Sequence, residues 1–346
     1  MFKLPPLPRT VLACELDLRS PDPDVRLAVV SDLAKVRDPE ELQVRTDLLL
    51  SALSDEEARV RKGALLSLAD VGATMHTELV ARKLGDREIA VRQMAILALG
   101  ELAEPGDEEM AGRIACFLRA GAPELRYQAL LAHCRLLPEH AATDLGDALG
   151  DEDAEVRQLA LRLIDELLLE ELRCKEAPLL IERAKVCARD GDPHVSLLAQ
   201  LVCSELRLDV PTHRIEQVVA GKLQVREPRD EQWAIALCGQ RGLRQALPAL
   251  RRRAFGWLGI SFDAHRFNAL AALVLLGDEK AAQRLVRGLS VRNFADRTRA
   301  AQALGESGHV AAQSVLKRLV GRESLIDQDV LNQALADLAQ AASKAP

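Results

Sequence analysis

Residues 84–102 read LGDREIAVRQMAILALGEL, a short polar turn followed by a longer apolar segment. In the apolar segment a single apolar stripe recurs at helical spacing, formed by Val91, Ala95, Leu99 and Leu102. Asp86 stands where an acid can accept backbone N–H groups at the start of a helix. The stretch therefore predicts a helix over about 78–84, a tight turn, and a second helix over about 89–102.

The valine–arginine pair of this stretch recurs along the chain. The first five pairs lie 31 to 35 residues apart: Val25-Arg26, Val60-Arg61, Val91-Arg92, Leu125-Arg126 and Val156-Arg157. The same frame continues at Ser196, Asp230, Arg266, Arg297 and Leu331. Alanine follows three residues past this slot in eight of ten cases, and an apolar residue seven past it in nine. Such a period indicates a stacked α-solenoid, so we predict an all-α fold of about ten helical hairpins.

Composition agrees with close helix packing. Apolar residues make up 48% of the 346 residues, yet aromatic residues make up only 3%. Leucine and alanine are strong helix formers that fill helix–helix seams without polar atoms. Because each hairpin buries its apolar face against its neighbours, a chain of this length need not divide into globular domains.

Cysteine usage and apolar runs bear on location. The seven cysteines are scattered, odd in number and never in a CxxC pair, so we expect free thiols, a reducing compartment and no zinc site. We expect no membrane span either, because no apolar run reaches about 18 to 20 residues. The N-terminus, residues 1–9, lacks the apolar core of a signal peptide. A cytoplasmic protein is expected.

The pattern Leu-x-Asp-x-x-x-x-Val-Arg followed by Ala and Leu, as in residues 149–164, resembles the HEAT-repeat family. The resemblance is to the short bacterial form found in phycobilin-lyase-like proteins, and it implies a right-handed superhelix. It is strong over residues 1–206 and looser over 207–346, so these are the expected N-terminal and C-terminal regions. The resemblance is specific for fold and weak for function, because unrelated functions share such folds.

The resemblance also implies a ladder in which the turn aspartate and the helix arginine join neighbouring repeats. We therefore assign a structural role, each with a turn carboxylate as partner, to Arg26, Arg61, Arg92, Arg126, Arg157, Arg266 and Arg297. A basic stripe that binds anions is the alternative.

The repeat pattern weakens in a basic and aromatic segment. Residues 214–299 hold 16 Lys+Arg against 8 Asp+Glu, whereas the whole chain has a net charge of −6. An uncharged aromatic stretch, residues 254–262, directly follows three arginines, a composition typical of binding hot spots. The candidate partner-binding residues are Arg251, Arg252, Arg253, Phe255, Trp257 and Phe262. Alternatively, the stretch folds back to cover a seam between repeats.

A second candidate surface lies on the second helices, which line the inner face in HEAT stacks. Nine residues past the arginine slot stand five acids, namely Asp70, Glu101, Glu166, Glu205 and Glu306, with Lys35 and Arg135 as exceptions. An acidic face of this kind would repel a phosphate backbone, although solvated helix faces are often acidic for solubility alone.

Enzymatic motifs are scarce. The sequence has no HExxH, Walker loop, GxSxG or GxGxxG, and the acids of residues 190–194 fit helix capping better than metal binding. We predict no catalytic residue, metal or cofactor. The leading hypothesis is a non-catalytic scaffold that binds another protein, with a homodimer through residues 254–262 left open.

Two alternatives come from other classes. One is nucleic-acid binding through residues 214–299, resembling the HEAT-like alkylpurine DNA glycosylases, with Trp233, Trp257 and Asp263 as conceivable members. The other is a phycobilin-lyase-like protein.

Overall fold

The structure, a computed structural model of the chain, describes residues 9–168, 177–256 and 263–344. These residues form twenty α-helices and no strand, and consecutive α-helices pair into ten hairpins. The all-α fold and the number of hairpins are thus confirmed. The chain falls into two compact units, Met1–Leu180 (unit 1) and Ile181–Pro346 (unit 2). The right-handed sense of the stack stays a prediction.

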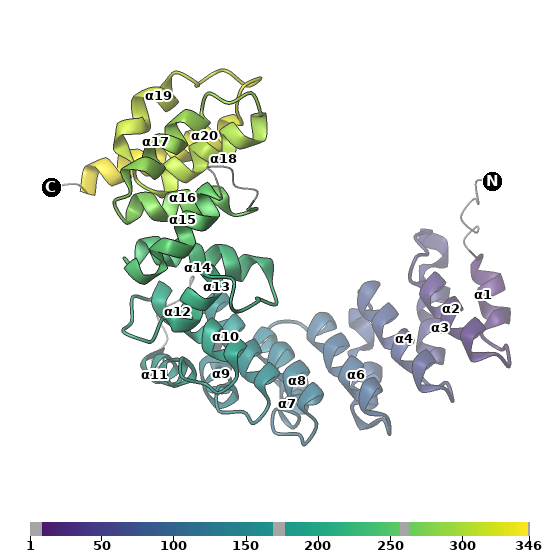
Figure 1. Cartoon of the computed structure of the whole chain (residues 1–346). Helices are drawn as coiled ribbons and strands as arrows, with labels where there is room; N and C mark the ends of the chain where they lie inside the picture. The colour runs from purple at the N-terminus through teal and green to yellow at the C-terminus, as the bar shows by residue number, and fades with distance from the viewer. Residues whose placement is uncertain (1–8, 169–176, 257–262, 345–346) are drawn as a thin grey trace. The chain divides into compact units, whose positions relative to one another are not determined.

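In unit 1 the hairpins follow one another in chain order (Figure 1). The helices are α1 (Val11–Asp17), α2 (Pro23–Leu33), α3 (Leu42–Ala52), α4 (Ala58–Asp70), α5 (Thr77–Ala81), α6 (Ile89–Leu102), α7 (Glu108–Ala115), α8 (Pro123–Leu136), α9 (Ala141–Ala148) and α10 (Ala154–Leu168). Helix α2 packs most extensively on α4, α4 on α6 and α6 on α8, so these four second helices form a continuous row.

Helix α11 (Ala177–Cys187) spans the boundary between the units, and unit 2 repeats the same plan. Its other helices are α12 (Pro193–Glu205), α13 (His213–Val219), α14 (Pro228–Gln240), α15 (Leu247–Phe255), α16 (Arg266–Leu275), α17 (Glu279–Gly288), α18 (Phe294–Glu306), α19 (Gln313–Lys317) and α20 (Gln328–Lys344). Here α14, α16, α18 and α20 form the row of second helices.

Short 3₁₀ turns accompany several first helices. Five of them open a hairpin and one extends α5: Pro39–Glu41, Thr74–His76, Pro138–His140, Arg244–Ala246, Val310–Ala312 and, after α5, Arg82–Gly85.

The third hairpin shows why the sequence folds in this way. Helix α6 begins at Ile89 and ends at Leu102, as predicted, and the Glu88 N–H donates to Asp86 Oδ1 at 3.1 Å just before it. The predicted first helix is a short α-helix continued by a 3₁₀ turn through Gly85. The polar turn satisfies backbone donors that the helix start leaves free.

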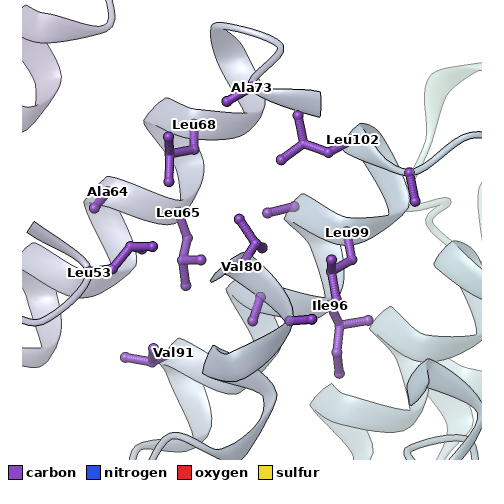
Figure 2. Packing of buried hydrophobic residues seen from close by; sticks show 14 of the residues in the cluster. Leu53, Ala64, Leu65, Leu68, Ala73, Val80, Val91, Ile96, Leu99 and Leu102 are labelled. Carbon is purple, nitrogen blue, oxygen red and sulfur yellow. The ribbon is translucent and has the colours of Figure 1, made fainter. Parts of the chain in front are cut away.

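The core is a continuous layer of leucine, alanine and valine between adjacent hairpins. Figure 2 shows how α4, α5 and α6 contribute side chains to it. Leu65, Leu68, Val91 and Leu99 are fully buried there, and the small Ala64 lies among them. Each hairpin therefore depends on its neighbours to shield its apolar face.

Glycines bring the second helices unusually close together. A Cβ added at Gly239 of α14 would lie 2.7 Å from the Ala272 Cα of α16, and one at Gly305 of α18 would lie 2.7 Å from the Ala334 Cα of α20. No side chain fits at such a distance. In these two seams, α14 to α16 and α18 to α20, the helices thus pack backbone against backbone.

The seventh repeat corrects the predicted frame by one residue. The frame placed the slot at Asp230 and the alanine position at Trp233, but the buried alanine is Ala234. Gly239 then lies eight residues past Glu231, as Gly305 lies eight past Arg297. Glu231 therefore occupies the arginine slot, and Trp233 falls on a different face of α14.

Candidate functional site

Three of the slot arginines join neighbouring repeats through a turn aspartate. Arg61 donates from Nε and Nη2 to the two carboxylate oxygens of Asp86, both at 2.8 Å. Equivalent two-bond pairs link Arg26 to Asp55 at 2.7 and 2.9 Å, and Arg126 to Asp151 at 2.8 and 2.7 Å. We call each such pair a rung. These side chains are almost entirely buried, so the rungs hold adjacent hairpins in register.

The rungs keep their carboxylates ionised. Hydrogen bonds from Arg61 lower the pKa of Asp86 below its ordinary value, and burial opposes this only in part. At Asp55 burial favours the neutral form, yet the hydrogen bonds from Arg26 and from the Glu57 N–H still lower its pKa. Asp86 raises the pKa of Arg61 in turn. The pairs are therefore charged across the neutral range.

The other slot arginines do not all follow this plan. Arg266 pairs with Asp296 at 2.6 Å, at the start of the following second helix rather than in the turn. Arg297 Nε donates to the Leu325 carbonyl at 2.6 Å. Arg157 donates to the Asp151 and Glu152 carbonyls of its own turn at 2.8 and 3.0 Å, and Arg61 and Arg126 make the same bonds to their own turns, so this contact is no departure from the plan.

Arg92 likewise donates to carbonyls of its own turn, at Asp86 and Arg87. Within the described part of the chain, Arg92 and Arg297 have no carboxylate partner. The expectation of a turn carboxylate for every slot arginine is therefore wrong at these two positions, and also at Arg266, whose carboxylate partner lies in a helix. At Arg92 the cause is visible in the sequence, because Ala120 stands where the next turn would carry aspartate.

The predicted partner-binding arginines of α15 make contacts inside unit 2. Arg251 donates to Asp278, and Arg252 Nη2 donates to the Ala220 carbonyl at 2.8 Å. Phe255 is half-buried at the end of the helix. Trp257 and Phe262 lie outside the described residues, so partner binding through this segment stays a prediction.

Arg253 forms a rung of reversed polarity. It is largely buried, and it donates to Glu231 at 2.6 Å and to Asp263 at 3.1 Å. Its Nε also binds the Val219 carbonyl at 2.7 Å. Because Glu231 occupies the arginine slot, the acid here comes from the second helix and the arginine from the next repeat. Arg253 thus fixes α15 to α13 and α14.

A groove runs along the row of second helices in unit 2. It has a volume of about 410 Å³ and is lined mainly by α14 and α16, with residues Arg229, Gln232, Trp233, Ala236, Gln240, Asn268, Ala271, Ala272, Leu275 and Glu306. We call it the Trp233 groove. Trp233 Nε1 donates to Glu205 Oε2 at 3.0 Å, which fixes the half-buried indole, and Leu275 is 41% exposed.

The acidic positions predicted for the second helices are divided between the second helices of the two units. In unit 1, Lys35 and Asp70 line one groove together with the exposed Leu66, between α2 and α4. Glu101 forms an ion pair with Arg135, the predicted exception. Glu166 has its side chain outside the described residues. The acids are thus partly neutralised or hydrogen-bonded rather than forming one repelling strip.

Part of the basic segment gathers in a second hollow of unit 2, of about 320 Å³. Three arginines line it, Arg266, Arg284 and Arg287. Arg266 lies 4.8 Å from the centre of the Phe267 ring and pairs with Asp296, so part of the positive charge is used internally.

Potential metal ligands stay apart from one another in the described ranges. No group of three or more His, Cys, Asp or Glu side chains among those residues could hold a metal ion. Asp192 caps α12 by accepting the N–H groups of His194 and Val195 at 2.8 and 3.0 Å, as its sequence context predicts. Over the same residues no helix is both long and apolar enough to cross a membrane.

Sequence reasoning identified Trp233 only as a conceivable nucleic-acid contact. The signal that it lies at a groove was its place at an alanine position of the frame, where a tryptophan cannot fit. The bond to Glu205 required the structure, because the two residues are 28 positions apart.

Comparison with known proteins gives a family match over part of the chain and a likeness in fold over most of it. Residues 46–111 match HEAT repeats, and no curated protein matches the chain. YibA of E. coli is 14% identical, with 91% of this chain and 97% of that chain covered and a TM-score of 0.53. A chain of an AP-3 complex homology model is 16% identical, with 86% and 58% covered and a TM-score of 0.54.

A chain of the CpcE–CpcF complex of phycocyanin lyase from Nostoc sp. PCC7120 is 17% identical, with 80% and 96% covered. Its TM-score of 0.42 is too low to support an argument about function. At such identities the likenesses concern the fold alone. YibA and the AP-3 chain share the helical fold of this chain, and residues 46–111 match HEAT repeats, so the predicted resemblance to HEAT repeats is confirmed over those residues.

Proposed function

We propose that this chain is a non-catalytic scaffold that binds another protein along the second helices of unit 2. The observation that supports this most directly is the Trp233 groove. Its indole is fixed by Glu205 and stands near Arg229 and the exposed Leu275. Tryptophan and arginine beside apolar surface are the residues that dominate binding hot spots.

The groove suits a partner that offers an apolar side chain between polar ones. Arg229 and Glu306 both line the groove, so ionisable side chains of both signs are present there. Ala236, Ala271 and Ala272 form a floor of small side chains. An amphipathic helix laid into a groove makes contacts of this kind.

The test is affinity capture from the native cell with three forms of the purified protein. We expect the unmodified chain to retain a specific protein, Trp233→Ala to lose it, and Trp257→Ala to keep it. Circular dichroism must show equal helix content in all three. Loss with Trp257→Ala alone would instead place docking at the predicted loop. If no protein is retained specifically, the scaffold proposal is contradicted.

The second hollow gives nucleic-acid binding one supporting observation, namely the three arginines that line it. Phosphate binding would fall steeply as salt rises, because it releases counterions. A gel-shift series at increasing salt tests this, with Arg287→Gln as the variant. Absence of a shift at low salt would remove the alternative.

A further inference from the structure

The rung between the third and fourth repeats differs from its neighbours by one side chain. Turns 53–57, 84–88 and 149–153 carry an aspartate two residues after the leucine, whereas turn 118–122 carries Ala120. The arginine that would meet it, Arg92, is present. Both positions belong to the same molecule, so the Arg61 rung serves as an internal reference for the Arg92 position.

Arg92 is anchored in the same way as Arg61. Its Nη1 donates to the Asp86 and Arg87 carbonyls at 2.7 and 3.1 Å. Arg61 Nη1 donates to the corresponding Asp55 and Glu56 carbonyls at 2.9 and 3.0 Å. The shared anchor leaves Nε and Nη2 for the next turn, and neither atom of Arg92 has an acceptor among the described residues.

The turn that follows Arg92 also keeps the conformation of an occupied rung. Ala122 has φ −87° and ψ 120°, close to the −92° and 128° of Glu88. The Glu88 N–H donates to the Asp86 carboxylate. Over the part of the chain that the structure describes, the equivalent Ala122 N–H has no acceptor. Arg126 holds the Ala120 and Gly121 carbonyls at 2.9 and 3.1 Å, which fixes the backbone of this turn.

We propose that Arg92 and Ala122 bind the carboxylate of another molecule at this rung. One oxygen accepts from Arg92 Nε, and the other accepts from Arg92 Nη2 and the Ala122 N–H, as the Asp86 oxygens do one repeat earlier. A planar guanidinium held by two carbonyls matches a carboxylate bidentately without further ordering.

Local charge and access fit such a ligand. Turn 118–122 contains Arg119 and no acid, whereas turn 149–153 contains three acids. Gly121 is exposed, so the position next to Ala120 opens to solvent. The carboxylate is that of a small organic acid or of an Asp or Glu side chain of a partner. This site lies in unit 1 and is independent of the Trp233 groove.

The experiment uses the full chain and follows the Arg Nε–H and backbone N–H signals by NMR while acetate replaces chloride at constant ionic strength. We expect Arg92 Nε–H and Ala122 N–H to shift saturably, and Arg61 Nε–H, whose rung is filled by Asp86, to stay in place. In Ala120→Asp the side chain supplies the carboxylate, so the acetate response should be lost and the thermal midpoint should rise.

A second variant keeps the test decisive. Arg92→Gln removes the guanidinium group that would bind the carboxylate, so the Ala122 N–H should no longer respond to acetate. Two blocked peptides distinguish the sources, one with Asp and one with Asn at its centre: a response to the Asp peptide assigns a protein partner, and a response to acetate alone assigns a small acid. If Ala120→Asp responds to acetate as the unmodified chain does, or if no signal moves, the proposal is overturned.

Discussion

At the scale of single residues, the rungs are buried ion pairs with two hydrogen bonds each that join neighbouring repeats in unit 1. Arg61 and Asp86 have side chains only 6% and 7% exposed, and two bonds at 2.8 Å join them. Replacing a buried pair by apolar residues is often neutral, but removing one partner leaves an uncompensated buried charge. The rungs therefore disfavour displacement of one hairpin relative to the next, because displacement would leave buried charges without their partners.

Asp86→Ala should lower the free energy of unfolding by about 3–5 kcal/mol, because Arg61 stays buried without its partner. Asp24→Ala is the matched control, since its pair with Arg59 is exposed and should contribute only about 0–1 kcal/mol. Urea denaturation measures both. Equal effects of the two substitutions would contradict a special role for the rung.

Acid should weaken the rungs in a defined direction. The folded pKa of Asp86 lies below its unfolded value, which is about 3.9 for aspartate. The contribution of the Asp86 carboxylate to the free energy of unfolding is therefore complete above about pH 4. It declines as the pH falls toward the pKa of Asp86 in the folded state. The thermal midpoint should drop as the pH falls below about 4, and the drop should be smaller in the double variant Arg61→Met, Asp86→Leu. If the thermal midpoint of the double variant falls with pH as steeply as that of the unmodified chain, carboxylates other than Asp86 dominate the acid response.

Thiol reactivity should separate exposed from buried cysteines. Burial raises the pKa of Cys134 to about 12 and that of Cys238 to about 12, whereas Cys116 is exposed. Because the thiolate is the reactive form, Cys116 should react quickly with a thiol reagent at neutral pH and the other two only after unfolding. The fast phase should lose one thiol in Cys116→Ser, and a fast phase that is unchanged would place Cys116 inside the fold.

At the scale of helices, the glycine seams decide how closely the second helices pack. Gly239→Ala would place a Cβ 2.7 Å from the Ala272 Cα and 3.0 Å from the Ala272 carbonyl oxygen, so α14 and α16 must separate. Separation also widens the Trp233 groove, which those two helices line. Packing and the proposed binding surface are therefore coupled at this seam.

We expect Gly239→Ala to destabilise the protein by about 1–3 kcal/mol through overpacking. Gly112→Ala is the control, because Gly112 lies in α7 with no atom within 4 Å of an added Cβ. It should stabilise by about 0.5–1 kcal/mol through helix propensity. Thermal unfolding of the two variants should thus shift in opposite directions, and a shift of Gly239→Ala in the same direction as the control would exclude the close seam.

At the scale of the whole chain, periodicity was sufficient to predict the fold. The stripe from Val91 to Leu102 predicted α6 with both its ends, because each stripe residue is buried. In the seventh repeat the prediction slipped by one residue, because Trp233 and Ala234 are adjacent and both apolar. Only burial decides which of them faces the core.

The candidate site was less predictable for a physical reason. The reversed rung between Arg253 and Glu231 depends on side chains 22 residues apart. In the sequence Arg253 is only the last of three consecutive arginines, a pattern that predicts an exposed basic surface. The Trp233 groove depends on exposure across three helices. Neither property is periodic in the sequence, so neither could be read from the repeat.

Each hairpin is stabilised by its immediate neighbours alone. Hydrogen exchange followed by mass spectrometry on Gly239→Ala is the decisive test, because opening free energies are local in a stacked repeat protein. We expect faster exchange in α14 and α16 and in the hairpins beside them, with α2 and α4 unchanged. Equally faster exchange along the whole chain would contradict it.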